Sequence, residues 1–141
     1  MSSLQYRLLA IASFIAAITI IIGALGAHFL KSILDATELN SIETAVRYQM
    51  YHAFAIMFLV LLATKAKPST INTLLYVFIA GIICFSGSIY VFTLLSILNI
   101  NVPSFVRLIT PIGGLLLVAG WGILCSNSIK HLYQRNKERN S

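Results

Sequence analysis

Long apolar runs without charged side chains alternate with short polar connections along the whole chain. The four runs occupy residues 8–30, 48–64, 71–98 and 111–129. A helix needs roughly 20 mostly apolar residues to cross a hydrocarbon layer of about 30 Å, and each run is close to that length or longer. The runs lack the polar–apolar alternation of membrane β-strands, so they predict helices. We therefore expect an all-α integral membrane protein made of one four-span domain, residues 1–141.

The composition supports this fold class and narrows the choice of partners. Hydrophobic residues make up 58% of the chain and charged residues 10%, whereas soluble domains average about 45–50% and about 25%. The net charge of +6 could indicate a nucleic-acid-binding protein, but much of it comes from a short basic tail, residues 130–141. Such a tail is typical of a cytoplasmic end beside anionic lipid headgroups. We expect the lipid bilayer as a partner, and no nucleic acid.

The distribution of basic residues predicts how the chain crosses the membrane. An N-terminus in the cytoplasm places seven of the ten Lys and Arg residues on the cytoplasmic side. These seven are Arg7, Lys65, Lys67, Lys130, Arg135, Lys137 and Arg139, whereas Lys31, Arg47 and Arg107 remain on the other side. Because basic residues concentrate in cytoplasmic loops, we expect both termini in the cytoplasm.

Two sequence signals predict where the second and fourth helices begin. Asn40 and Glu43 have the spacing of a capping box, so we expect the second helix to begin near Asn40, outside the hydrocarbon layer. Thr110 followed by Pro111 resembles an N-cap residue followed by proline at the first helical position. The fourth helix can instead begin near Ser104 if Pro111 only kinks it.

Polar side chains at membrane depth gather toward the outer half of this topology. Such groups are costly in lipid and indicate a functional site by default. On the second span, Tyr48, Gln49 and His52 share a helix face because they are three or four residues apart. His52 can donate through one ring nitrogen and accept through the other, so we expect it to link the first three spans. The full predicted cluster is His28, Arg47, Tyr48, Gln49, Tyr51, His52, Ser86, Ser88, Tyr90, Arg107 and Thr110.

The residues alone leave several interpretations of this cluster open. Interhelical hydrogen bonds in membranes average about 0.6 kcal/mol, and the cluster can simply join helices. It can also bind a ligand or line a path for protons or solutes. A zinc site is disfavoured because two histidines and a glutamine fall short of a ligand set, and no nucleophile–base pair is visible. We expect no metal, no cofactor and no catalytic residue.

Small residues mark the expected helix contacts. Gly23 and Ala27 form a small-xxx-small pair near the end of the first span, which permits another helix to approach closely. Gly113, Gly114 and Gly120 give the fourth span the same property. Gly113 and Gly120 are seven residues apart and lie on nearly one helix face, which offers a contact surface for a possible homo-oligomer. The single tryptophan, at position 121, is expected to be packed or interfacial rather than a cofactor platform.

A family resemblance covers nearly the whole chain. The motifs that carry it are GALGAH at residues 23–28, YQMYHA at 48–53, FSGSIY at 85–90, TPIGG at 110–114 and GW at 120–121. In this order they resemble the YgdD/YwdK-like family of small bacterial inner-membrane or cell-membrane proteins. The resemblance implies a multi-pass protein of the cell membrane, expected in the bacterial cytoplasmic membrane, whose biochemical function is uncharacterised. It supplies no catalytic residues, but its motif positions coincide with much of the polar cluster.

Three functions are therefore carried forward. We expect a non-enzymatic membrane protein that binds a lipid, a small ligand or a protein partner. The alternative is an oligomeric small-solute or proton-coupled transporter, which the lack of a carboxylate within the predicted spans disfavours. The further alternative is a membrane enzyme that uses His28 or His52 as a base, which rests on residue type alone.

Overall fold

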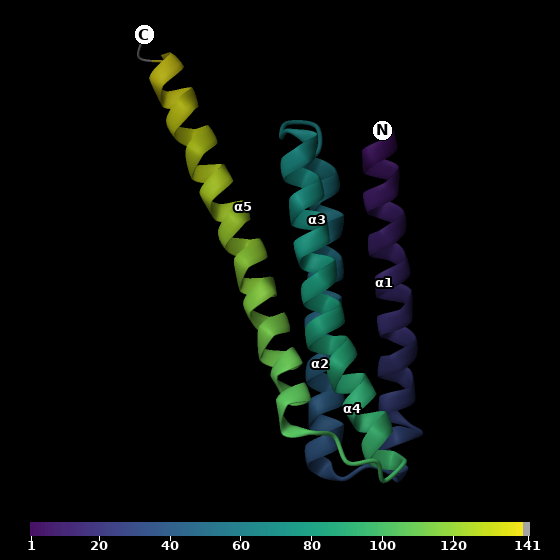
Figure 1. Cartoon of the computed structure of the whole chain (residues 1–141). Helices are drawn as coiled ribbons and strands as arrows, with labels where there is room; N and C mark the ends of the chain where they lie inside the picture. Colours follow the sequence, from purple (N-terminus) through teal and green to yellow (C-terminus); the bar gives the residue numbers. More distant parts are fainter. Residues whose placement is uncertain (140–141) are drawn as a thin grey trace.

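The computed structural model describes residues 1–139, and within that range it is helical without any strand. Four long rods run up and down side by side, and both chain termini lie at the same end (Figure 1). We call this end the terminal end and the opposite one the loop end. The elements are α1 (Ser3–Ala27), η1 (Leu30–Ser32), α2 (Ala36–Leu62), α3 (Pro68–Ile82), η2 (Ile83–Gly87), α4 (Ser88–Ile97), η3 (Ser104–Leu108) and α5 (Ile109–Arg139).

The rods have the length and composition of membrane spans. The four candidate spans are Ser3–Ser32, Ala36–Leu62, Pro68–Ile97 and Ser104–Lys137. The third span joins α3 and α4 through η2, a single widened turn of π-helix. These four spans confirm the predicted all-helical, four-span architecture.

The predicted start of the second helix is wrong. The N-cap of α2 is Asp35, whose Oδ1 accepts a hydrogen bond from the backbone N–H of Glu38 at 2.8 Å. Glu38 Oε2 in turn accepts from the backbone N–H of Asp35 at 3.3 Å, which completes a capping box. The box at Asn40 has the same spacing, but the structure uses the one at Asp35, so α2 begins at Ala36. As expected, this helix begins well before Tyr48, the first residue of the second apolar run.

The third span ends in a Schellman motif. Asn99 has a positive φ of 56°, a conformation that asparagine tolerates better than most residues. The backbone N–H of Asn99 donates to the carbonyl of Ser96, and that of Ile100 donates to the carbonyl of Leu95, both at 2.9 Å. These bonds satisfy the last carbonyls of α4 and turn the chain toward η3.

Of the two possible starts of the fourth helix, the structure has the earlier one. The short 3-10 helix η3 begins at Ser104 and leads directly into α5 at Ile109. Thr110 therefore lies inside α5 and is not its N-cap. Pro111 lies in the first turn of α5, where its missing N–H removes little helical hydrogen bonding.

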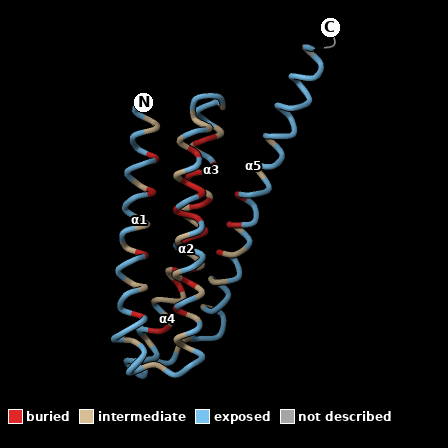
Figure 2. Tube along the Cα trace, turned by 180° about the vertical axis from the view of Figure 1, so that it is seen from behind, coloured by how far each residue is buried: buried red, intermediate tan, exposed pale blue. Residues whose placement is uncertain are grey.

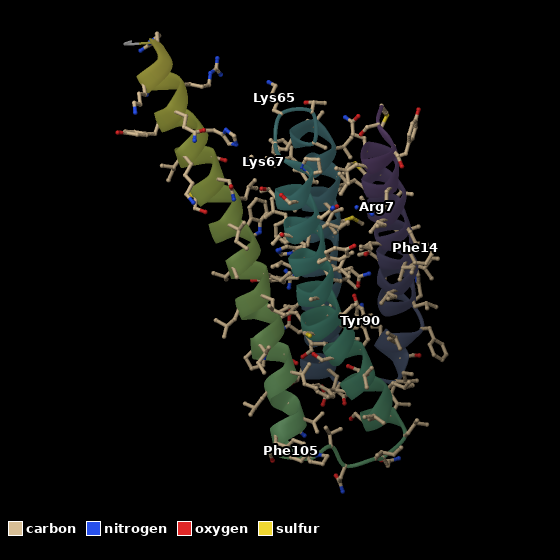
Figure 3. The ribbon with its side chains drawn as sticks, turned by 45° about the horizontal axis from the view of Figure 1, so that its top comes forward. Arg7, Phe14, Lys65, Lys67, Tyr90 and Phe105 are labelled. Atoms are coloured by element: carbon tan, nitrogen blue, oxygen red, sulfur yellow. The ribbon has the colours of Figure 1, made fainter. Side chains whose placement is uncertain are left out.

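The chain buries residues only along the inner sides of the rods (Figure 2). α1 packs chiefly against α2, and α5 packs chiefly against α3 and η2. The outward side chains are large and apolar, as lipid contact requires; Phe14 is one, and Figure 3 shows it directed away from the bundle. Beyond Gly120, α5 leaves the bundle and its residues are mostly exposed (Figure 2).

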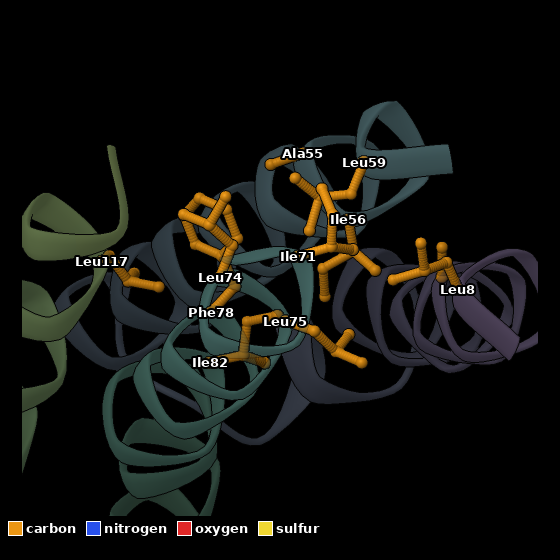
Figure 4. Close-up of a cluster of buried hydrophobic side chains, with 11 residues drawn as sticks. Leu8, Ala55, Ile56, Leu59, Ile71, Leu74, Leu75, Phe78, Ile82 and Leu117 are labelled. Atoms are coloured by element: carbon orange, nitrogen blue, oxygen red, sulfur yellow. The ribbon is translucent and has the colours of Figure 1, made fainter. Parts of the chain in front are cut away.

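An apolar core fills the half of the bundle near the termini (Figure 4). Its fully buried side chains come from α1, α2 and α3. They include Leu8, Ile56, Leu59, Ile71, Leu74, Leu75 and Phe78. Leu117 of α5 joins this core next to Gly81 of α3.

Glycines let α5 approach the third span within one chain. A Cβ on Gly113 would meet the backbone of Cys84 and Phe85, at 2.6 Å from the carbonyl carbon of Cys84. A Cβ on Gly120 would lie 2.5 Å from the ring of Phe78. The prediction that Gly113 and Gly120 form a contact face between copies is therefore wrong, since both are used inside the chain.

The remaining predicted packing residues differ in their surroundings. A Cβ on Gly114 would be at an ordinary 3.6 Å from the Phe85 ring, and one on Gly23 would be 3.4 Å from Val46 on α2. Ala27 is exposed at the end of α1.

We predict that Gly113→Ala lowers the free energy of unfolding by about 1–3 kcal/mol, because the new methyl group meets backbone atoms that cannot rotate away. Gly122→Ala is the matched control: no atom lies within 4 Å of its Cβ position. We expect the control to be neutral or to stabilise by up to about 1 kcal/mol. Trp121 fluorescence during unfolding in mixed detergent–SDS micelles measures both, and equal stabilities would contradict this packing.

Candidate functional site

His52, near the middle of α2, links α2 to α5. Its Nδ1 lies 2.7 Å from the carbonyl oxygen of Tyr48, and its Nε2 lies 3.2 Å from the indole nitrogen of Trp121. Indole is only a donor and a carbonyl is only an acceptor. Both bonds therefore form together only when Nδ1 carries the proton and Nε2 does not. The imidazole is thus the neutral Nδ1–H tautomer, with both nitrogens engaged.

Aromatic rings enclose this link. The Phe78 ring centroid lies 5.6 Å from the rings of both His52 and Trp121. His52 and Trp121 are themselves 6.2 Å apart and nearly edge-on. The ring of Phe78 fits there because Gly120 has no side chain. The histidine was predicted to link the first three spans; it links the second and fourth instead.

Two further bonds join α2 to the third span. The hydroxyl of Tyr90 donates to Gln49 Oε1 at 2.9 Å. The hydroxyl of Ser86 donates to the backbone carbonyl of Ala45, also at 2.9 Å, in a fully buried position. Because Ser86 lies in the π turn and Tyr90 lies one turn later, the pair holds η2 and α4 against one face of α2.

Ser88 joins the third span to α5. Its Oγ lies 2.7 Å from the hydroxyl of Thr110 and 2.9 Å from the carbonyl oxygen of Phe85. The Ser88 hydroxyl has one proton, so it donates to one of these two oxygens. When it donates to the carbonyl of Phe85, it accepts a hydrogen bond from the hydroxyl of Thr110. Gly113 packs on this same π turn. The widened turn is therefore held by two contacts: the close approach of Gly113 and the hydrogen bond from Ser88 to the carbonyl of Phe85.

These bonds engage much of the predicted cluster at depth in contacts between helices. Among the side chains that the structure describes, no buried nitrogen or oxygen lacks a hydrogen-bond partner. Seven predicted residues take part in the network, and all of them join helices or pack on those that do. They are Tyr48, Gln49, His52, Ser86, Ser88, Tyr90 and Thr110. The network therefore acts as an interhelical tie.

The other predicted residues form no hydrogen bond with the residues of the tie. His28, Arg47, Tyr51 and Arg107 are exposed. Arg47 donates from Nη2 to Thr44 one turn earlier on α2, at 3.3 Å. His28 ends α1 as its C-cap residue.

Sequence reasoning missed Trp121 as a member of the network. The available signal was its donor-only indole N–H, which needs an acceptor when it lies within a span. Nothing in the local sequence indicates that the acceptor is His52, because the two residues are 69 positions apart.

A second feature is a polar pocket at the loop end, which we call the end pocket. It has a volume of about 670 Å³ and lies between α2, α4 and the connection from α4 to α5. This volume is within the range of about 300–1,000 Å³ typical of small-molecule sites. Its lining residues are Glu38, Ser41, Ile89, Phe92, Thr93, Ser96, Asn99, Ile100, Asn101, Val102, Arg107 and Thr110.

Two opposite charges line the end pocket without pairing. Glu38 Oε1 accepts a hydrogen bond from Ser96 at 2.5 Å, and its other oxygen caps α2. Arg107 lies in the last turn of the short helix η3. Among the described side chains, neither of these two forms an ion pair, and the Arg107 guanidinium has no hydrogen-bond partner. Only Arg107 and Thr110 of the predicted cluster reach this pocket.

The described residues contain no group of three or more His, Cys, Asp or Glu side chains that could hold a metal ion. Cys84 is half-buried and Cys125 is exposed, and both are free thiols.

Comparison with known proteins agrees with this architecture. The family described as "Protein of unknown function (DUF423)" matches residues 22–114. This chain belongs to that family. The matched segment contains the whole interhelical tie except Trp121, and it contains every residue that lines the end pocket.

Bacterial relatives match most of the chain. The UPF0382 membrane protein YwdK of Bacillus subtilis is 33% identical over 112 residues, which cover 79% of this chain and 86% of YwdK. The UPF0382 inner membrane protein YgdD of Escherichia coli K12 is 34% identical over 117 residues, or 80% of this chain and 82% of YgdD. A UPF0382 membrane protein of Haemophilus influenzae is 36% identical and covers 77% of this chain and 82% of its own. The predicted family is thereby confirmed. No solved structure matches the chain.

We predict that His52→Phe and Trp121→Phe each lower the free energy of unfolding by about 1–2 kcal/mol, because each leaves the partner's polar group unpaired. The double variant should lose less stability than the sum of the two single losses, since the second substitution leaves no further polar group unpaired. Pulse proteolysis along an SDS titration measures all three.

The exposed His28 provides the control for this cycle. His28→Ala should change the free energy of unfolding by less than about 0.5 kcal/mol. Strict additivity of His52→Phe and Trp121→Phe would show that the two side chains are not energetically coupled.

Proposed function

We propose that this protein is a non-enzymatic membrane protein that binds a small polar ligand in the end pocket. The observation that carries the proposal is the pocket itself: about 670 Å³ lined by one carboxylate, one guanidinium, two amides and several hydroxyls. Binding sites usually combine such a few converging polar groups with apolar walls, and Ile89, Phe92 and Val102 provide the apolar part.

The chemistry of the lining supports binding over catalysis. Glu38 and Arg107 are the two titratable side chains among the lining residues. An arginine does not transfer protons in proteins, and Glu38 is engaged by Ser96 and by the cap of α2. His52 has both nitrogens in bonds within the chain and does not line the pocket. The hypothesis of a histidine base therefore gains no support.

The packing inside the bundle counts against a transport path through one chain. Between the end pocket and the terminal end lie the interhelical tie and then the apolar core (Figure 4). The core side chains are fully buried, with Ile56, Leu59 and Phe78 at 0% exposure. Protein interiors packed in this way leave little room for a hydrated path. A transporter would have to use an interface between copies.

We further propose that the protein lies in the bacterial cytoplasmic membrane with its terminal end in the cytoplasm. The relative YgdD is named an inner membrane protein. Arg7, Lys65 and Lys67 lie toward the terminal end, whereas Phe105 marks the loop end (Figure 3). The basic tail of α5 belongs to the same terminal end, and basic residues favour the cytoplasmic side. The end pocket then faces the outer surface of that membrane.

We predict that Ser41→Trp abolishes ligand retention by filling the end pocket. Ser41 lines the pocket, and its hydroxyl donates to the carbonyl of Thr37 four residues earlier at 2.9 Å. Native mass spectrometry of the full chain in mild detergent should show a retained species that the variant lacks. Ser128→Trp is the matched control, because Ser128 makes the same bond to Leu124 at 2.9 Å on the exposed part of α5.

Two outcomes would contradict ligand binding in this pocket. One is a protein that is bare under every gentle extraction tried. The other is a retained species that persists unchanged in Ser41→Trp. Thermal stability equal to that of Ser128→Trp shows that the bundle of Ser41→Trp remains folded.

The orientation is testable with reporter fusions. Green fluorescent protein after Ser141 should fluoresce, and alkaline phosphatase at the same position should be inactive. Alkaline phosphatase fused after Val102, in the connection between α4 and η3, should be active. The reverse pattern would place the end pocket in the cytoplasm and would contradict the charge argument.

A further inference from the structure

We propose that the end pocket recognises a phosphoethanolamine group, with Glu38 binding the ammonium and Arg107 the phosphate. This inference rests on the proposed function and names the chemical class of its ligand. The group can belong to a phosphatidylethanolamine headgroup or to free phosphoethanolamine, and the two sources share this chemistry.

The carboxylate of Glu38 is held in place but is not neutralised. Ser96 and the backbone N–H of Asp35 each occupy one site on its oxygens. A carboxylate offers about four acceptor sites, so capacity remains for a donor from the ligand. No Lys, Arg or His side chain among residues 1–139 pairs with it. A cationic N–H donor complements both its charge and its remaining acceptor sites.

A primary ammonium fits this carboxylate better than a quaternary one. Quaternary ammonium groups have no N–H to donate and are recognised by several aromatic faces around them. Phe92 is the single aromatic residue lining the end pocket. Glu38 and Ser41 of α2 and Thr93 of α4 instead offer oxygen acceptors.

Arg107 supplies the complementary anion site. Its guanidinium carries five donors in a planar fork that matches the oxygens of a phosphate. Asn99 and Asn101 of the same connection line the pocket with amide donors. Arg107 and Glu38 line one cavity, yet no ion pair within 4 Å joins them. Two unpaired charges of opposite sign in one cavity complement a ligand that carries both an ammonium and a phosphate.

The depth of the pocket suits a headgroup. α2 has 27 residues, which span about 40 Å at 1.5 Å per residue. A bilayer with its headgroup layers is about 40–45 Å thick, so the first turns of α2 reach the headgroup layer. Glu38 and Ser41 lie in those turns. The apolar lining residues Ile89 and Phe92 of α4 would then contact the glycerol and the start of the acyl chains.

The test places the full chain in phosphatidylcholine nanodiscs that contain a minor share of either phosphatidylethanolamine or phosphatidylglycerol. Native mass spectrometry after bilayer release counts which lipid stays bound. Glu38→Gln and Arg107→Ala are compared with Glu43→Gln and Lys31→Ala, two exposed positions at the same end that do not line the pocket. Glutamine also completes a capping box, so Glu38→Gln keeps the start of α2.

The expected result is retention of phosphatidylethanolamine over both other lipids by the wild type and both controls. Glu38→Gln should reduce that preference about tenfold or more, the value of one charge-assisted hydrogen bond. Arg107→Ala should reduce retention of phosphatidylethanolamine by a similar factor. A second arm titrates free phosphoethanolamine into phosphatidylcholine-only nanodiscs by calorimetry. Binding heat that both variants abolish would identify free phosphoethanolamine as the ligand. Retention of phosphatidylethanolamine without such heat would identify the lipid headgroup as the ligand.

Equal retention of all three lipids, with no heat from free phosphoethanolamine, overturns the ligand class. If another species is then retained and Ser41→Trp removes it, the proposed binding function stands and only the ligand class fails. If no species is retained by any form of the protein, both proposals fail together.

Discussion

The close approach of α5 to the third span is the constraint on which the rest of the structure depends. Gly113 packs directly on the backbone of the π turn η2, and Gly120 leaves space for the Phe78 ring. Lipid tails are as apolar as the side chains they meet, so helices in a bilayer associate through close packing and hydrogen bonds rather than through burial of apolar surface. This approach brings Thr110 to Ser88 and Trp121 to His52. It also sets where η3 enters the bundle, and therefore where Arg107 lies at the end pocket.

The polar groups at depth and those in the end pocket have opposite roles. The hydrogen bonds of the interhelical tie all lie within the chain, which lowers the cost of placing the bonded groups in lipid. His52 is the clearest case, because its two bonds fix both the tautomer and the ring orientation. In the end pocket, two charges of opposite sign are positioned by secondary structure and remain unpaired with each other. Groups whose bonding is complete stabilise a fold, whereas positioned groups with bonding capacity left over are suited to a ligand.

Much of the fold follows from the sequence because the bilayer imposes length and polarity on each span. Helix periodicity also indicated that Tyr48, Gln49 and His52 share a face, and the structure places all three toward other spans. The errors arose where local signals were degenerate: Asp35 and Asn40 both begin capping-box patterns, and the structure uses the one at Asp35. The partner of His52 and the existence of the end pocket could not be predicted, because both depend on the path of the connection between α4 and α5.

That connection also explains why the end pocket lies where it does. The Schellman motif at Asn99 ends α4 and turns the chain toward η3. A direct helical hairpin would have closed α4 against α5, but residues 99–103 and the short helix η3 cross the end of the bundle first. The connection therefore forms one wall of a cavity whose other walls are the first turns of α2 and the last turns of α4. Because these walls are helix ends at the headgroup level, they carry polar groups that would be costly a turn deeper in the bilayer. The same geometry that satisfies the helix termini thus leaves a polar cavity open to the membrane surface.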